Sequence, residues 1–168
     1  MESGWRGQVA AILAAALCAV VLLLLAPRIA RSDVPAVSVA IVLAADVSGS
    51  ITRDQIMLQR EGAAAAFMHP AILDAIAGTA ERRIAVAVVE WDDDTRQSVV
   101  LPWTLVADHD DAEAASAALL GAPIRSGGGT SLAGMLRFAA VLLAACPCRP
   151  ARQVIDVSSD GEHPPRGR

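Results

Sequence analysis

A short segment in the first third of the chain carries oxygen donors at a regular spacing. Asp46, Ser48 and Ser50 stand two residues apart, so on an extended turn their side chains can point toward one place. One carboxylate and two hydroxyls are hard oxygen ligands, which suit Mg²⁺ or Mn²⁺ rather than zinc. Taken alone, this pattern is also typical of an ordinary polar loop, so its meaning depends on what lies nearby.

Two more oxygen donors are expected at the same edge of the fold. Thr130 ends a triple-glycine loop and opens a helical segment, while Asp160 follows an apolar strand and precedes a glycine. A cation would remove the repulsion between Asp46 and Asp160, and two carboxylates would neutralise a divalent ion. We therefore predict a Mg²⁺ or Mn²⁺ site whose ligands are Asp46, Ser48, Ser50, Thr130 and Asp160.

Four apolar runs of strand length would position these residues. Runs without polar alternation are typical of strands buried on both faces of a parallel sheet. Strands are predicted over residues 37–45, 83–91, 97–103 and 152–158. Helices are predicted over residues 52–68, 110–120 and 131–145, and a further helical piece follows the interruption at Pro70 and ends at about residue 77. Strands interspersed with helices predict a doubly wound, Rossmann-like, mostly parallel α/β sheet that binds ligands at the carboxyl ends of its strands. The acidic turn at 92–95 joins the second and third strands as a hairpin, which makes one edge strand antiparallel.

The N-terminal segment has the character of a membrane signal. Residues 9–26 carry no charge, and about 18 apolar residues is borderline between the core of a secretory signal and a membrane-spanning helix. The predicted division is a flank at 1–8, a signal anchor or signal peptide at 9–26, a linker at 27–36, a folded domain at 37–161 and an irregular tail at 162–168. By analogy with exported proteins, the domain is expected outside the cytoplasm, periplasmic or extracellular. It would be membrane-anchored through the N-terminal helix, or secreted if the signal is cleaved.

Composition and charge exclude two classes of protein. With 54% hydrophobic and 19% charged residues, the chain is not intrinsically disordered. Its formal net charge is −4, and no run of basic residues is interleaved with aromatic residues. We therefore expect no nucleic-acid partner.

Three other clusters receive plainer interpretations. Glu90 and Trp91 end a strand near the predicted site, and we expect a packed tryptophan beside a solvated acid. The three aspartates at 92–94 could bind calcium, but a solvated hairpin turn is the preferred interpretation. Cys146 and Cys148 flank Pro147 and could bind metal or form a local disulfide; we favour two thiols at the end of a helix, since two ligands are too few for structural zinc.

The site motifs together resemble a known family. D-x-S-x-S after the first strand, Gly-Thr in the loop and S-x-D-G after the fourth strand resemble the metal-ion-dependent adhesion site of von Willebrand factor A domains. More narrowly, the segments at 58–67, 89–91, 102–104, 129–131 and 154–157 are similar to a bacterial von Willebrand-A-like family catalogued as domain of unknown function number 1194. The resemblance implies the same five metal ligands and a protein partner that donates a carboxylate to the metal.

The resemblance also implies strands that this chain lacks. The full fold has about six strands in the order 3-2-1-4-5-6, whereas the chain stops just beyond its fourth. We expect an incomplete, C-terminally truncated domain whose fourth strand is a bare edge and whose soluble part is only marginally stable.

Three functions are compatible with these observations. The leading one is a metal-ion-dependent protein-binding module of an exported or membrane-anchored bacterial protein, which is not an enzyme. An alternative is a metal-dependent phosphoryl-transfer or hydrolytic enzyme with Asp46 as nucleophile. That alternative is weakened because Ser48 replaces the second aspartate of such phosphatases and the chain contains no lysine. A third alternative is a defective, truncated paralogue without activity.

Overall fold

The computed structural model describes residues 34–125 and 127–161. The predicted signal anchor or signal peptide at 9–26 lies outside the described residues. None of the helices in the described part is both long enough and apolar enough to span a membrane.

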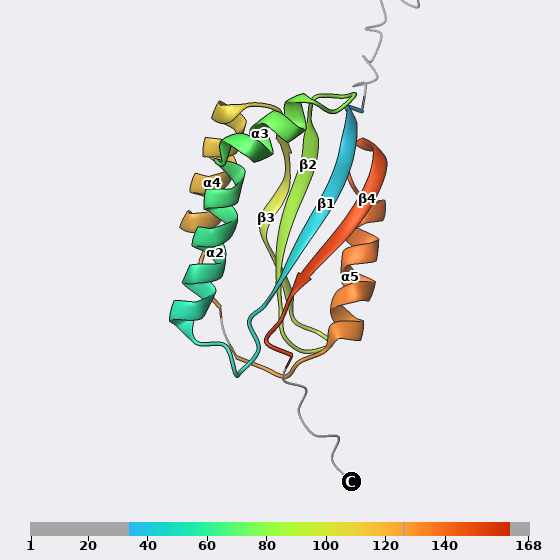
Figure 1. Cartoon of the computed structure of the whole chain (residues 1–168). Coiled ribbons are helices and arrows are strands. Elements are labelled where there is room, and N and C mark those ends of the chain that lie inside the picture. Colours follow the sequence, from blue (N-terminus) through green and yellow to red (C-terminus); the bar gives the residue numbers. More distant parts are fainter. Residues whose placement is uncertain (1–33, 126, 162–168) are drawn as a thin grey trace, which may run out of the picture. The chain divides into compact units, whose positions relative to one another are not determined.

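Four strands form one mixed sheet in the order β3-β2-β1-β4 (Figure 1). The strands are β1 (Ala36–Asp46), β2 (Ile84–Trp91), β3 (Gln97–Val106) and β4 (Arg149–Ser158). β1 pairs in parallel with both β2 and β4, and β3 pairs antiparallel with β2. The predicted doubly wound α/β sheet with one antiparallel edge strand is confirmed.

Helices cover both faces of this sheet. The helices are α2 (Arg53–Phe67), α3 (Pro70–Ala77), α4 (His109–Gly121) and α5 (Leu132–Ala144). In Figure 1, α2, α3 and α4 lie on one face and α5 lies on the other. α2 begins where predicted, because Thr52 caps it and forms a capping box with Gln55.

The two faces have separate apolar cores. On the α5 side, Met135 and Ala139 pack against β1 residues such as Val42. On the other side, Phe67 and Leu119 pack against β2 residues such as Val88. β2 supplies both cores and is almost wholly buried, which explains its continuous apolar sequence.

The winding of the chain fixes where a ligand can bind. The connection from β1 to β2 runs through α2 and α3 on one face. The connection from β3 to β4 runs first through α4 on that same face and then through α5 on the other, from which the chain enters β4 (Figure 1). The reversal of the winding therefore lies between β1 and β4, which are neighbours in the sheet. In open α/β sheets the ligand crevice lies at this point, outside the carboxyl ends of the strands. The segments that follow β1 and β4 are the two that carry the predicted aspartates.

Candidate metal centre

The first predicted ligand segment is a tight loop at the end of β1. Asp46 is the last residue of the strand and is fully buried, with 0% of its surface exposed. Its Oδ1 accepts the Ser48 backbone N–H at 2.8 Å, which bends the chain back over the carboxylate. Ser48 is 1% exposed, and its hydroxyl lies 3.3 Å from the hydroxyl of Ser50. The loop therefore holds the two hydroxyls next to each other and ties the Ser48 backbone to the Asp46 carboxylate.

The second predicted ligand segment meets the first at the end of β4. Ser159 Oγ donates to Asp46 Oδ2 at 2.7 Å, and Gly161 N donates to Ser159 Oγ at 3.2 Å. Asp160 and Asp46 line the same surface depression, together with Ile51, Gln55, Leu58, Gln59, Ser158 and Ser159. Asp46 and Asp160 thus come from adjacent strands to one place, as the parallel sheet predicts.

Gln59 of α2 holds the two strand ends together. Its Nε2 donates to the Asp46 carbonyl oxygen at 3.2 Å, and its Oε1 accepts the Ser158 hydroxyl at 3.0 Å. Sequence reasoning did not single out this residue. It lies on the helix that follows the motif, and only the packing of α2 over the β1–β4 junction brings it to the site.

The glycine loop lies against the loop that follows β1. Gly127 N donates to the Val47 carbonyl oxygen at 3.2 Å, and Gly49 N donates to the Gly128 carbonyl oxygen at 3.3 Å. Thr130 follows this contact in the chain. Among the described residues no hydrogen bond joins Thr130 to Asp46, Ser48 or Ser50. Thr130 instead lines a separate depression with residues of α5. The structure therefore brings four predicted ligands to one edge and places Thr130 two residues beyond the contacting glycine.

The donor set fits a hard divalent cation. The Asp46 carboxylate is buried and accepts from a backbone N–H and a hydroxyl. No arginine or histidine of the described residues forms an ion pair with it. Burying a carboxylate without a cation is costly, so these oxygen atoms suit a positive ligand. Within the described ranges no group of three or more His, Cys, Asp or Glu side chains could hold a metal, and the candidate site instead combines two carboxylates with hydroxyls.

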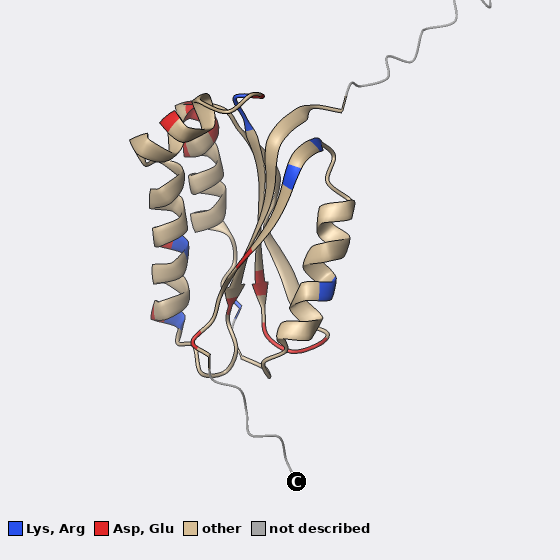
Figure 2. Ribbon diagram, turned by 45° about the vertical axis from the view of Figure 1, so that its right-hand side comes forward, with Lys and Arg blue, Asp and Glu red and all other residues tan. Residues whose placement is uncertain are grey.

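The acidic turn between β2 and β3 supports the glycine loop. Figure 2 shows acidic residues gathered at the end of the sheet where β1, β2 and β4 finish. Asp92 is buried rather than solvated, and its carbonyl oxygen accepts Ser131 N at 2.7 Å. Hydrogen bonds from the backbone and side chain of Thr95, followed by contact with Arg96, lower the pKa of Asp93 to about 2. The interpretation as a solvated turn holds for Asp94, which is exposed. The same interpretation is wrong for Asp92, because the glycine loop covers the Asp92 side chain.

Glu90 is not the solvated acid predicted. Its side chain is buried and accepts from Arg60 of α2, with Nε–Oε1 at 2.6 Å and Nη2–Oε2 at 2.9 Å. Arg60 is itself 3% exposed and also donates to the carbonyl oxygens of Ala122 and Pro123. The pair therefore links α2, β2 and the segment that leads into the glycine loop. Trp91 is buried, as predicted.

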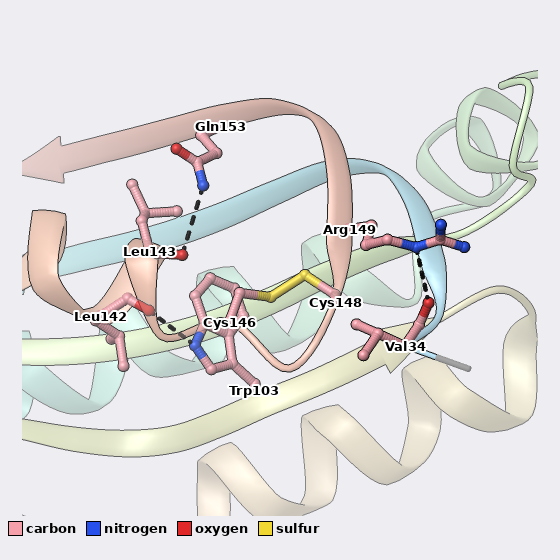
Figure 3. The surroundings of a disulfide bond; sticks show 8 residues. All are labelled: Val34, Trp103, Leu142, Leu143, Cys146, Cys148, Arg149 and Gln153. Carbon is pink, nitrogen blue, oxygen red and sulfur yellow. Dashed lines mark hydrogen bonds between the residues drawn. A yellow bond between two sulfur atoms is a disulfide. The ribbon is translucent and has the colours of Figure 1, made fainter. Parts of the chain in front are cut away.

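Cys146 and Cys148 form a disulfide bond in the turn between α5 and β4 (Figure 3). The prediction of two thiols at a helix end is therefore wrong. The turn after α5 brings the two Cα atoms to 5.2 Å, within the range that a disulfide needs. Cys148 is buried against the α5-side core beside Trp103, whose indole N–H donates to the Leu142 carbonyl oxygen at 3.2 Å.

Gly128 leaves little room for a side chain, because a Cβ there would displace neighbouring side chains. It has φ of +140°, and a Cβ there would overlap the Asp92 carboxyl group, with Cγ at 2.7 Å and Arg96 Nη2 at 2.8 Å. Overpacking of this kind costs about 1–3 kcal/mol. Gly128→Ala should therefore lower the free energy of unfolding by about 1–3 kcal/mol more than Gly127→Ala, measured by denaturant titration. Gly127 is the matched control, because it also has positive φ but faces open space; equal losses in the two variants would contradict the packing described.

Comparisons with known proteins place the chain in a family. Solved structures with a similar arrangement include three N-terminal domains of the type V pili tip protein Mfa5 from Porphyromonas gingivalis, with 21% identity and a TM-score of 0.47. The vWF domain of the same pilus protein has 21% identity and a TM-score of 0.46. Each match covers 76% of this chain but only 20% and 39% of those chains, respectively. No curated protein matches in sequence. The family model described as Protein of unknown function (DUF1194) matches residues 36–166, so the chain belongs to that family.

Proposed function

We propose that this chain is a metal-ion-dependent protein-binding module that acts outside the cytoplasm. The observation that carries the proposal is the Asp46 carboxylate, which is fully buried at the switch point of the sheet and accepts hydrogen bonds from two neutral donors, the Ser48 N–H and the Ser159 hydroxyl. A buried carboxylate beside a second acidic residue and two hydroxyls has the chemistry of a Mg²⁺ or Mn²⁺ site.

Each ligand has a distinct part in the proposed site. Asp46 and Asp160 supply the negative charge, while Ser48 and Ser50 supply neutral oxygen donors from one loop. Thr130 is the fifth proposed ligand, and the glycine loop that precedes it contacts the β1 loop at Gly49. Ser159 and Gln59 position the Asp46 carboxylate and carbonyl and do not belong to the ligand set. A bound metal would supply an open coordination position that accepts a carboxylate from a protein partner.

Two features support a location outside the cytoplasm. The disulfide between Cys146 and Cys148 is typical of proteins in oxidising compartments, since cytosolic thiols are kept reduced. The uncharged segment at 9–26 has the composition of a signal anchor or signal peptide. We propose that it anchors the domain to the membrane, or directs secretion if it is cleaved.

The binding function can be tested with a minimal carboxylate probe. The full chain in detergent micelles is loaded with Mn²⁺, and the relaxation of water protons is recorded while a short peptide with one aspartate is added. We expect the aspartate peptide to displace metal-bound water and lower the relaxation enhancement. The same peptide with asparagine is the control and should leave it unchanged. Equal responses to both peptides, or no response to either, would contradict a carboxylate-binding metal site.

A further inference from the structure

The acidic turn between β2 and β3 is fastened to the first turn of α5. The Ser131 backbone N–H donates to the Asp92 carbonyl oxygen at 2.7 Å, and the Ser131 hydroxyl donates to Asp94 Oδ1. Arg137 Nη2 donates to the same Asp94 oxygen at 3.2 Å. Ser131 is also the N-cap of α5, where its Oγ accepts the Gly134 N–H at 3.2 Å. The Ser131 hydroxyl therefore joins the turn to the helix through one donated and one accepted hydrogen bond.

Gly134 shows how closely the turn approaches α5. A Cβ at this position would lie 2.7 Å from Asp94 Oδ1 and 2.9 Å from Asp94 Cα. Glycine inside a helix is unfavourable relative to alanine, but only a residue without a Cβ lets the backbone of the turn lie so close to the helix. Gly134 is buried. The turn and the helix are therefore packed together at this point, although the Asp94 side chain is 65% exposed.

This contact fixes the chain on one side of Thr130. Ser131, which the acidic turn holds, directly follows Thr130 in the sequence. On the other side, two residues before Thr130, the Gly128 carbonyl oxygen accepts the Gly49 N–H of the β1 loop at 3.3 Å. Thr130 is half-buried between these two fastened points. The acidic turn and the loop after β1 therefore jointly determine where the Thr130 backbone lies.

We propose that Asp94 is a positioning residue for the metal site and that it acts through Ser131 on Thr130. The inference rests on the proposed function, in which Thr130 is a ligand. Asp94 is not a ligand itself, since its carboxylate accepts from Ser131 and Arg137. By holding the residue that follows Thr130, Asp94 orders the Thr130 backbone before a cation binds. A ligand that is ordered in advance loses less conformational entropy on binding, so the metal binds more tightly.

The position that Asp94 imposes can be separated from the charge that it carries. A carboxylate near a cation site attracts the cation through its charge alone, and the ion pair with Arg137 is exposed and so contributes little. The positioning role depends instead on the oxygen atom to which Ser131 donates. Asparagine at position 94 keeps an acceptor oxygen and removes the charge, whereas alanine removes both.

Isothermal titration calorimetry with Mn²⁺ on the full chain in detergent micelles tests this role. We expect Asp94→Ala to raise the dissociation constant by about threefold to tenfold, or about 0.7–1.4 kcal/mol, which is close to the cost of ordering the backbone of one residue. Asp94→Asn should stay within about twofold of the wild type, because it keeps the acceptor for Ser131. Circular dichroism of each variant shows whether its fold is unchanged.

A second variant breaks the same contact from the side of the helix. Gly134→Ala keeps the Asp94 carboxylate but forces the turn away from α5, because the new Cβ would overlap the Asp94 backbone. We expect it to weaken Mn²⁺ binding as Asp94→Ala does. Gly62→Ala is the matched control, since Gly62 also lies inside a helix, α2, and a Cβ there would meet no neighbouring atom. This control should bind Mn²⁺ like the wild type.

A double-variant cycle identifies the residue through which Asp94 acts. Thr130→Ala removes the proposed ligand hydroxyl and should itself weaken Mn²⁺ binding. If Asp94 acts by placing Thr130, adding Asp94→Ala to Thr130→Ala should weaken binding no further, because coupled residues are not additive. A merely structural role of Asp94 would instead lower the affinity by the same factor in both backgrounds.

Four results would overturn the positioning role. They are unchanged affinity in Asp94→Ala or in Gly134→Ala, an equal loss in Asp94→Asn, a loss in Gly62→Ala equal to that in Gly134→Ala, and independent losses in the double-variant cycle. Failure of the proposed function has a different signature. If the wild type binds no Mn²⁺, or if Asp46→Ala binds it as tightly, the metal site is wrong and this inference falls with it. If Asp46→Ala loses binding while Asp94→Ala does not, the metal site stands and only the role of Asp94 is wrong.

Discussion

Replacing Asp46 by alanine is expected to weaken Mg²⁺ or Mn²⁺ binding by about 100-fold. Interactions made by charged groups contribute about 1.5–3 kcal/mol, and each 1.4 kcal/mol is tenfold in affinity. Asp46 and Asp160 supply the formal negative charge of the proposed ligand set, and Asp46 is the one that is fully buried. Its loss also removes the acceptor for the Ser48 N–H and the Ser159 hydroxyl, so the loop that carries the proposed ligands is expected to lose its shape as well.

Isothermal titration calorimetry on the full chain in detergent micelles measures this effect. Ser50→Ala should weaken binding less, because water can replace a neutral hydroxyl. Asp74→Ala is the matched control, since it removes one exposed carboxylate from α3, away from the strand ends that form the site. Metal should also stabilise the wild-type fold by about 2.7 kcal/mol at a hundredfold excess over Kd. If the Asp46→Ala variant binds the metal as tightly as the wild type does, the proposed assignment of the metal site is wrong.

Replacing Arg60 by alanine is expected to lower the free energy of unfolding by about 3–5 kcal/mol, because removing one partner of a buried ion pair leaves an uncompensated buried charge. Here the charge left behind is Glu90, which is 3% exposed on β2. Arg60 also binds the carbonyl oxygens of Ala122 and Pro123, so its loss releases the segment before the glycine loop. Denaturant titration of the full chain gives the change in free energy.

A double variant separates charge burial from packing in this prediction. Replacing both partners of a buried ion pair by apolar residues is often neutral. Arg60→Met combined with Glu90→Leu should therefore recover a large part of the stability lost in Arg60→Ala. If Arg60→Ala costs less than about 1 kcal/mol, the typical value of an exposed pair, the pair does not carry the structural role assigned to it.

The sequence by itself determined the helices and strands and the edge of the sheet at which Asp46 and Asp160 lie. Uninterrupted apolar runs at 37–45 and 83–91 specified buried parallel strands, and Thr52 with Gln55 specified the start of α2. These signals are local, because strand burial and helix capping depend on residues a few positions apart. Once the strands are parallel, Asp46 and Asp160 must end at the same edge, whatever the details of packing.

Only the tertiary structure decided which polar side chains are buried and what they contact. Glu90 looked like a solvated acid because its partner, Arg60, lies thirty positions away in the sequence. Gln59 lies on α2 and reaches the ends of β1 and β4 only when that helix packs over both. Asp92 is buried by a glycine loop from beyond α4, and the closure of Cys146 onto Cys148 depends on the turn that α5 and β4 impose. The physical reason is the same in each case: burial of a charge or a thiol is set by contacts between segments far apart in the chain, and no local pattern encodes them.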